Sequence, residues 1–327
     1  MKLDKRVDVH GHYFPPAYQE ILSRHHMTFL DGAPRPAWSE EIQLSYMERL
    51  NISYSVLSIS SPHLHMGDPA EAIQAARACN EYGASLKRKH PGKFAIMASL
   101  PLPEIDASVA EIRYCHDKLK TDGFALQTHS LGVYLGDPKL DPVMEELNQL
   151  KSVVVIHPTQ PSSVPSHVGE KLPAALMEYF FDTTRAVTNM ILQGTIHRYP
   201  DIRFIIPHAG AFLPVLSDRL QTLSGALNLG NGLDIMGNLA SLYYDLAGMA
   251  MPKQYRLLKE ITDDSHILYG SDEPFTPLPL CARLAEEMDG ALTGIMAELI
   301  YRKNPLALFP DAAISLTAGE SCRETND

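Results

Sequence analysis

The sequence VDVHGH (Val7–His12) joins a short apolar run to two histidines near the start of the chain. Side chains two residues apart on an extended segment point to the same side, so the rings of His10 and His12 can bind one metal ion from one direction. This segment therefore predicts a metal site at the C-terminal end of a first strand.

Three further strand-like runs end in a residue that can coordinate a metal. His157 follows Val153–Ile156, His208 follows Arg203–Pro207, and Asp272 follows Ile267–Ser271. The C-terminal ends of parallel strands meet at one end of a barrel. We therefore expect these side chains to gather around a metal at the barrel mouth.

Strand-like runs alternate with amphipathic stretches along the chain. The predicted strands are Arg6–His10, Tyr54–Ser58, Phe94–Ser99, Gly123–Thr128, Val153–His157, Arg203–His208, Ser241–Leu246 and Ile267–Ser271. The predicted helices are Pro69–His90, Ile105–Leu119, Pro142–Leu150, Thr183–Tyr199 and Pro252–Ile261. Continuous apolar runs are typical of strands that helices cover on the outside. The alternation predicts an α/β protein with a (β/α)8 TIM barrel.

Two connections are irregular in sequence. Tyr13–Ser39 follows the first strand, is rich in proline and contains the only tryptophan, Trp38, while Pro158–Pro173 follows His157 directly. Long connections are often lids or binding loops, so we expect a lid-like insertion after the first strand and a second loop over the mouth. We assign residues 1–316 to a single barrel domain and 317–327 to a polar C-terminal tail.

The composition limits the classes of partner. The chain has 327 residues and a net charge of -11, which argues against nonspecific binding to nucleic acid, because that needs a basic surface. No apolar stretch approaches the length of a membrane helix, and the N-terminus does not resemble a signal peptide. The four widely spaced cysteines, Cys79, Cys115, Cys281 and Cys322, favour reduced thiols and a cytoplasmic location.

Three histidines and one carboxylate are a donor set that suits Zn²⁺, and also Mn²⁺, Fe²⁺ or Co²⁺ if water completes a larger shell. The alternative is that His157 and His208 are hydrogen-bonded core residues. That alternative does not explain why polar residues repeatedly end apolar runs at the same end.

Other histidines carry weaker signals. His63 and His65 form a second pair in the loop after the second strand, where a solvated position competes with a place in the pocket. His129 follows the fourth strand and would face the mouth.

Four motifs together resemble the amidohydrolase superfamily. They are VDVHGHYFPP (Val7–Pro16), IHP (Ile156–Pro158), PHAGAF (Pro207–Phe212) and YGSDEPF (Tyr269–Phe275). The chain is most similar to the metal-dependent decarboxylases typified by aminocarboxymuconate semialdehyde decarboxylase, which include γ-resorcylate, 5-carboxyvanillate and 6-methylsalicylate decarboxylases.

The resemblance implies a role for each matching position. His10, His12, His157 and Asp272 resemble the metal ligands, and His208 resembles the histidine that contacts the metal's water or the substrate. Arg219 resembles an arginine at the substrate or dimer-interface end of its helix; pairing with a nearby carboxylate is the alternative. The family also implies a homodimer or homotetramer, with Arg219 reaching across the interface as one arrangement.

One departure concerns the substrate. Where the muconate-semialdehyde enzymes have an arginine a few residues after a tryptophan, this chain has Gln43 after Trp38. A monocarboxylate with a ring hydroxyl therefore fits better than a dicarboxylate held by two arginines. No lysine ends the fourth strand, so the dinuclear pattern with a carbamylated lysine also lacks support.

We therefore expect a carboxy-lyase that releases CO2 from a small hydroxyaromatic or related unsaturated acid, with one Zn²⁺ or Mn²⁺ per chain. Asp272 would deliver the proton to the ring carbon, and His208 would act on the hydroxyl or a water. The residues expected at the substrate ring are Trp38, Phe212 and Phe275, each of which packing alone could also explain. The alternatives are a metal-dependent hydrolase or hydratase, which uses the same ligands to activate water, and a non-catalytic scaffold with a closed metal site.

Overall fold

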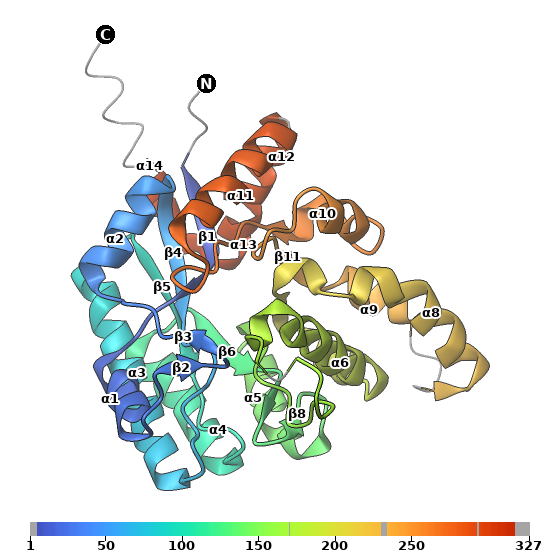
Figure 1. The fold of residues 1–327 in the computed structure, drawn as a ribbon, viewed down its shortest axis with the longest axis horizontal. Coiled ribbons are helices and arrows are strands. Elements are labelled where there is room, and N and C mark those ends of the chain that lie inside the picture. Colours follow the sequence, from blue (N-terminus) through green and yellow to red (C-terminus); the bar gives the residue numbers. More distant parts are fainter. Residues whose placement is uncertain (1–4, 170, 230–233, 293, 318–327) are drawn as a thin grey trace.

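Eight parallel strands form one sheet in the computed structural model, and their spatial order is their order along the chain (Figure 1). They are β1 (Arg6–His12), β4 (Ile52–Ser58), β5 (Phe94–Ser99), β6 (Gly123–Gln127), β9 (Val153–His157), β10 (Arg203–Ile206), β11 (Tyr243–Asp245) and β12 (Ile267–Leu268). The structure describes residues 5–169, 171–229, 234–292 and 294–317. The predicted tail, 317–327, lies outside these ranges except for its first residue.

The segment after β12 closes the sheet against β1. The backbone N–H of Val9 donates to Tyr269 O at 3.0 Å, and Asp272 N donates to His10 O at 2.7 Å. Gly11 and Glu273 form a parallel bridge beyond them. The eight strands thus form a (β/α)8 barrel, which confirms the predicted fold class.

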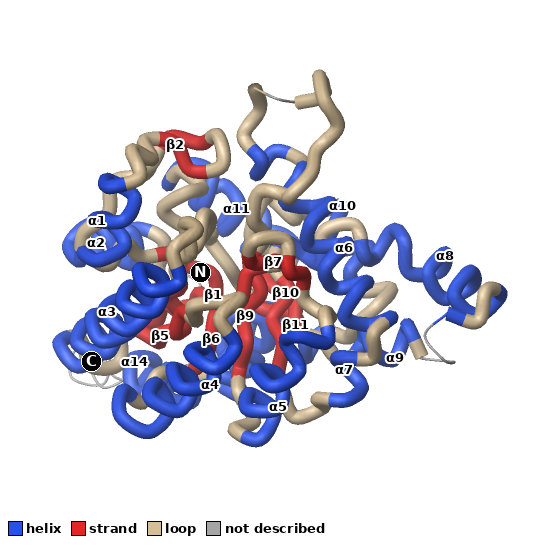
Figure 2. The backbone as a smooth tube through the Cα atoms, turned by 90° about the horizontal axis from the view of Figure 1, so that it is seen from below, coloured by secondary structure: helices blue, strands red, loops and turns tan. Residues whose placement is uncertain are grey.

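Helices surround the strands of the barrel, and the last two close its N-terminal end (Figure 2). They are α2 (Glu40–Arg49), α3 (Pro69–Lys89), α4 (Ile105–Tyr114), α5 (Asp141–Gln149), α6 (Glu178–Leu192), α7 (Thr195–Arg198), α8 (Leu213–Ala226), α9 (Ile235–Ala240), α10 (Lys253–Leu258), α11 (Leu278–Ala291), α12 (Gly294–Glu298), α13 (Asn304–Leu308) and α14 (Ala313–Thr317). The predicted helix Thr183–Tyr199 is two helices, because Gly194 adopts a left-handed φ of 71° between them. No helix in the described ranges is long and apolar enough to cross a membrane.

The connection Tyr13–Ser39 is more regular than its proline content indicated. It contains α1 (Pro16–Arg24) and a small hairpin of β2 (Phe29–Leu30) and β3 (Ala33–Pro34). Pro16 is the first residue of α1, a position where its missing N–H costs nothing, so the Pro15-Pro16 pair starts a helix instead of preventing one. A second hairpin, β7 (His129–Ser130) with β8 (Val133–Tyr134), follows β6.

Two apolar cores flank the strands. One lies between the sheet and the surrounding helices. The other fills the barrel interior and includes Val7, Val56, Met97 and Val155. The same interior cluster contains Leu308, Phe309, Ala312 and Leu316, from α13, α14 and the turn between them. The C-terminal segment therefore plugs the N-terminal end of the barrel and leaves the opposite end for the site.

Candidate active site

A β-bulge in β1 aims the first two histidines into the barrel. The stretch from Asp8 to Gly11 lies opposite the shorter stretch from Ser55 to Leu57 on β4, so β1 carries one extra residue there. Val9 belongs to the interior core, yet His10, the next residue, also reaches the interior site. A bulge re-aims side chains in this way and is common beside active sites.

The carboxylate of Asp8 stabilises this bulge. Its Oδ1 accepts hydrogen bonds from the backbone N–H groups of His10 and Ser271, both at 3.0 Å, and its Oδ2 accepts one from the Ser271 hydroxyl at 2.6 Å. Burial raises the pKa of Asp8 to about 6, although these hydrogen bonds act to lower it. Asp8 thus joins β1 to the end of β12.

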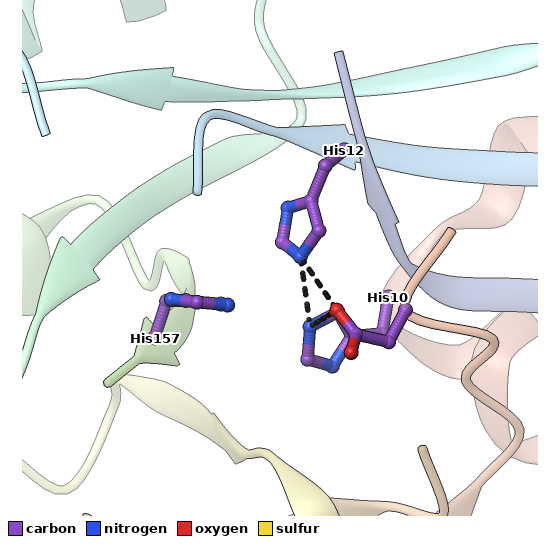
Figure 3. A group of neighbouring side chains, drawn as sticks. His10, His12 and His157 are labelled. Carbon is purple, nitrogen blue, oxygen red and sulfur yellow. Dashed lines mark hydrogen bonds and ion pairs between the residues drawn. The ribbon is translucent and has the colours of Figure 1, made fainter. Parts of the chain in front are cut away.

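Four side chains predicted as metal ligands meet at the barrel mouth. One donor atom from each of His10, His12, His157 and Asp272 lies within 4.8 Å of all the others. His12 Nε2 is 3.1 Å from both His10 Nε2 and Asp272 Oδ1. Figure 3 shows the three labelled histidine rings turned towards a common space.

Hydrogen bonds on the far side of each ring fix which nitrogen faces that space. His10 Nδ1 donates to Asp245 Oδ2 at 2.9 Å, His157 Nδ1 to Pro158 O at 2.7 Å, and His12 Nδ1 to Ser58 O at 3.4 Å. The partners of His10 and His157 are carboxylate or carbonyl oxygens, which only accept, so the proton of a neutral ring is on Nδ1 in these two; His12 Nδ1 also lies 3.2 Å from the Ser58 hydroxyl, which can donate or accept. The Nε2 lone pairs then point at one another, as they do around a bound metal.

The charges around the site fit a divalent cation. Burial lowers the pKa of His157 and also that of His12, although the Asp272 carboxylate beside His12 acts to raise it, and low pKa values favour neutral rings. Burial opposes charge on His10 as well, but Asp245 raises the pKa of His10 to about 9 and so increases its basicity. The 3.1 Å separation of His10 Nε2 and His12 Nε2 requires a positive charge between the two nitrogens, which a proton or a metal ion can supply. The donor set therefore fits a divalent metal ion.

Asp272 lies in a strained turn directly after β12. Its φ is +61°, a left-handed conformation that aspartate tolerates better than most residues. Although burial opposes its charge, the neighbouring histidines lower the pKa of its carboxyl group. Oδ1 faces the histidines and Oδ2 accepts a hydrogen bond from the Thr276 hydroxyl at 3.0 Å. The side chain also lines the cavity described below.

His208 begins a run of left-handed residues after β10. His208, Ala209, Gly210 and Ala211 have φ values of 55°, 51°, 73° and 53°. The ring of His208 stacks on Phe180, and a Cβ on Gly248 would lie 2.9 Å from its Cδ2. Its Nδ1 is buried without a hydrogen-bond partner among the described residues. Strained backbone around an unsatisfied nitrogen is typical of a functional site.

A cavity of about 420 Å³ opens beside these groups. Its lining comprises Leu30, Asp31, Ala33, Pro34, Pro36, Ser60, His157, Ala175, Tyr179, Phe180, His208, Gly248, Asp272, Pro274, Phe275, Thr276 and Pro277. Apolar residues make up more of the lining than polar ones, as in a small-molecule site. The hairpin of β2 and β3 contributes four of the lining residues, as expected of a lid.

Of the residues predicted to contact the substrate, Phe275 lines this cavity. Trp38 and Phe212 are not among its described lining residues: Trp38 packs on Tyr13, and Phe212 packs on Phe180 and Phe181. Arg219 is exposed on α8 and does not line the cavity of its own chain.

Gln43 lies beneath the cavity wall. It is fully buried, donates to the Glu273 carboxylate and accepts a hydrogen bond from Trp38 Nε1 at 2.9 Å. The residue that replaces the family's arginine therefore has a structural partner, and burial raises the pKa of Glu273 beside it.

The secondary histidines are largely structural. His129 bridges the two mouth loops, with Nε2 3.0 Å from Gln160 O. His63 and His65 are partly buried, and the solvated position weighed for them is wrong: burial lowers the pKa of His63 to about 4, and the side chain of His65 is 4% exposed beside Glu104. Leu64, which lies between these two histidines, is fully buried in the apolar core.

Sequence reasoning missed several residues of the site. Asp245 is the last residue of β11 and orients both His10 and the backbone of His208. Its carboxylate accepts hydrogen bonds from His10 Nδ1 and, at 3.1 Å, from the backbone N–H of His208. The signal was present, since Asp245 ends an apolar run as Asp272 does. Tyr179 and Phe180 could not have been found, because they begin a helix whose approach to the mouth depends on the whole fold.

Comparisons with known proteins agree with this geometry. The amidohydrolase family model matches residues 7–310. Decarboxylase macB of Penicillium terrestre is 35% identical over 292 residues, covering 84% of this chain and 85% of that protein. The 6-methylsalicylic acid decarboxylase acuB of Aspergillus aculeatus is 31% identical and covers 93% of this chain and 96% of its own. A crystal structure of an amidohydrolase II superposes with a TM-score of 0.89 at 36% identity, covering 93% of this chain and 99% of the other.

Proposed function

We propose that this chain, which belongs to the amidohydrolase family, is a metal-dependent decarboxylase of a small hydroxyaromatic acid. It is a carboxy-lyase that releases CO2 without oxidation. The observation that carries the proposal is the meeting of His10, His12, His157 and Asp272 at one end of an apolar cavity. Relatives that align over most of both chains are decarboxylases, one of them acting on 6-methylsalicylic acid.

The four donors would hold one divalent ion per chain, Zn²⁺ or Mn²⁺. Three imidazole nitrogens favour zinc, whereas a carboxylate and added water favour manganese. When bound, the ion would supply a Lewis acid that stabilises negative charge on the substrate's oxygen atoms. Asp245 and Asp8 hold the ligands in place from outside the site.

The chain's own residues bind the ring and move the proton. Phe275 and Phe180 offer aromatic walls to a flat substrate. Asp272 takes the proton of the ring hydroxyl and delivers it to the ring carbon that bears the carboxylate, so that CO2 can leave. His208, with Nδ1 free of a described partner, orients the hydroxyl. The phenolate that remains takes a proton from water.

A hydrolase or hydratase is the competing function, since the same donors can activate water, with Asp272 as the base. Its product would show net addition of water instead of CO2 release. A closed scaffold fits less well, because His157 and Asp272 line an open cavity.

We propose a homodimer or homotetramer, and the surface of α8, a helix that extends away from the barrel, supports this assembly (Figure 1). Val215, Leu223 and Leu227 are exposed at spacings of four or eight residues, and Arg219 lies in the same row. Arg219 would then reach the pocket of a partner subunit, which light scattering with and without Arg219→Ala can test. The three described cysteines are free thiols, which supports a cytoplasmic location.

The direct test measures CO2 from a panel of ortho-hydroxybenzoic acids with protein loaded in turn with Zn²⁺ or Mn²⁺. We expect release from one or a few members, its loss after exhaustive chelation, and recovery with about one equivalent of metal. If no acid of the panel releases CO2 while the metal is bound, the decarboxylase is rejected. If CO2 release survives chelation, the reaction does not depend on a metal.

A further inference from the structure

A single carboxylate joins the loops that roof the cavity. Asp31 Oδ2 accepts hydrogen bonds from the Ser61 hydroxyl at 2.5 Å, the Tyr179 hydroxyl at 2.7 Å and the Gln160 backbone N–H at 3.1 Å. These donors come from the loop after β4, from α6 and from the loop after β9. All three are uncharged groups, so nothing among them neutralises the carboxylate.

The backbone of Asp31 and Gly32 also packs closely against the segment before α6. Asp31 has a φ of +46° and Gly32 a φ of +86°, and Asp31 O accepts a hydrogen bond from Ala174 N at 2.8 Å. A Cβ on Gly32 would lie 2.9 Å from the Cα of Pro173. The turn between β2 and β3 is therefore seated directly on the segment before α6. Figure 2 shows the β2 hairpin at the same end of the barrel as β7.

Asp31 also gives the cavity its charge. Among the described residues that line the cavity, Asp31 and Asp272 are the carboxylates, and no lysine or arginine is present. Asp272 belongs to the metal donor set, whereas Asp31 lies on the lid. Tyr179 stands between Asp31 and the metal end, since its ring packs on His157 with centroids 5.9 Å apart.

We infer that Asp31 is the specificity-determining residue of this cavity: it fastens the lid and excludes acids that carry a second negative charge. The inference rests on the proposed function for the class of ligand, an aromatic acid whose one carboxylate binds at the metal end. A second carboxylate on the ring would lie near Asp31, and no lysine or arginine among the described lining residues would offset its charge. At separations of roughly 6–10 Å and intermediate dielectric, such repulsion weakens binding about tenfold to a hundredfold.

The test compares matched ligands. Each pair is a 2-hydroxybenzoate with either a methyl group or a carboxylate at the same ring position, taken in turn from position 3 to position 6. Binding to metal-loaded protein is measured by calorimetry, and CO2 release is followed in parallel. We expect the methyl member of each pair to bind at least tenfold more tightly than its carboxylate partner.

Asp31→Asn separates the effect of the negative charge of Asp31 from the effect of its hydrogen bonds to the loops. Asparagine tolerates the left-handed backbone, and its carbonyl oxygen can accept the same three hydrogen bonds, but it has no charge. We expect Asp31→Asn to reduce the ratio of the two affinities in a pair at least tenfold at one or more ring positions. The matched control is Asp201→Asn, because Asp201 is exposed just before β10 at the opposite end of the barrel. The control should leave the preference unchanged.

Asp31→Ala removes the fastening as well. We expect faster proteolysis of the 158–173 loop in this variant than in Asp31→Asn. The inference is overturned if the protein binds both members of every pair equally, or if Asp31→Asn keeps the full preference for the methyl member. It is also overturned if the protease cleaves Asp31→Ala no faster than it cleaves the parent protein. Absence of CO2 release from every acid, with the binding preference intact, would instead reject the decarboxylase and leave the role of Asp31 standing.

Discussion

The two ends of this barrel differ in what their buried residues do. At the C-terminal end, polar side chains such as His157 and His208 are buried around a cavity, and Asp272 and His208 have left-handed backbones. At the N-terminal end, Leu308, Phe309 and Leu316 pack among the interior residues of the strands. One end concentrates strain and desolvated charge, whereas the other buries apolar surface.

The difference indicates how the barrel can tolerate its site. Desolvated donors and positive φ angles cost stability unless a ligand compensates for them. Burial of apolar side chains at the closed end offsets that cost. In TIM barrels the end with the C-terminal strand ends carries activity and the other end carries stability. Variants at the two ends should therefore separate activity from stability.

The largest effect is expected for Asp272→Asn. Asparagine accepts the left-handed backbone, so the fold should remain, but it is a weaker metal donor and cannot carry the proton. We expect CO2 release to fall on the order of 10³-fold or more, with the melting temperature nearly unchanged. A variant that binds metal and keeps a near-normal rate would reject the proton-delivery role.

Phe309→Ala, at the closed N-terminal end, should lower stability and leave the rate of CO2 release unchanged. The ring is 1% exposed, and its removal leaves a hole in the interior core. We expect a loss of about 3–5 kcal/mol in the free energy of unfolding, measured with urea, and an unchanged rate for the folded fraction. Phe29→Ala is the control, because Phe29 is 60% exposed and should change stability by less than about 0.5 kcal/mol.

Asp245→Asn tests whether the metal end depends on its outer support. The Oδ1 of an asparagine can keep the hydrogen bonds from His208 N and Ala247 N, but its amide NH2 would then meet the Nδ1 proton of His10. His10 would move that proton to Nε2, the donor atom. We expect metal affinity to fall about 10- to 100-fold in competition with a chelating dye. Unchanged affinity would show that Asp245 does not set the tautomer.

Gly248→Ala should have the smallest effect. The added Cβ would lie 2.9 Å from His208 Cδ2, and the residue has a φ of +74°. We expect a displaced His208 to slow CO2 release by about tenfold or less while metal affinity stays the same, at a cost of about 1–3 kcal/mol in stability. Gly225→Ala on α8, where a Cβ meets open space, is the control and should leave the rate unchanged. A parent-like rate for Gly248→Ala would argue against a role for His208.

Sequence patterns located the strands well and the connections less well. Val153–His157 is a strand over the predicted range, because a continuous apolar run is buried on both faces whatever surrounds it. The excursion Tyr13–Ser39 contains a helix and a hairpin that its prolines concealed. Local signals are ambiguous there, since a proline pair can begin a helix or prevent one.

The order of residue types along the chain determined the parallel barrel and brought His10, His12, His157 and Asp272 to one end, because each lies at or beyond the C-terminal end of its strand and parallel strands end together. Only the tertiary structure decided the bulge that turns His10 inward, the place of Asp245 behind it and the joining of three loops by Asp31. These features depend on contacts between segments far apart in sequence, and no local pattern encodes such contacts.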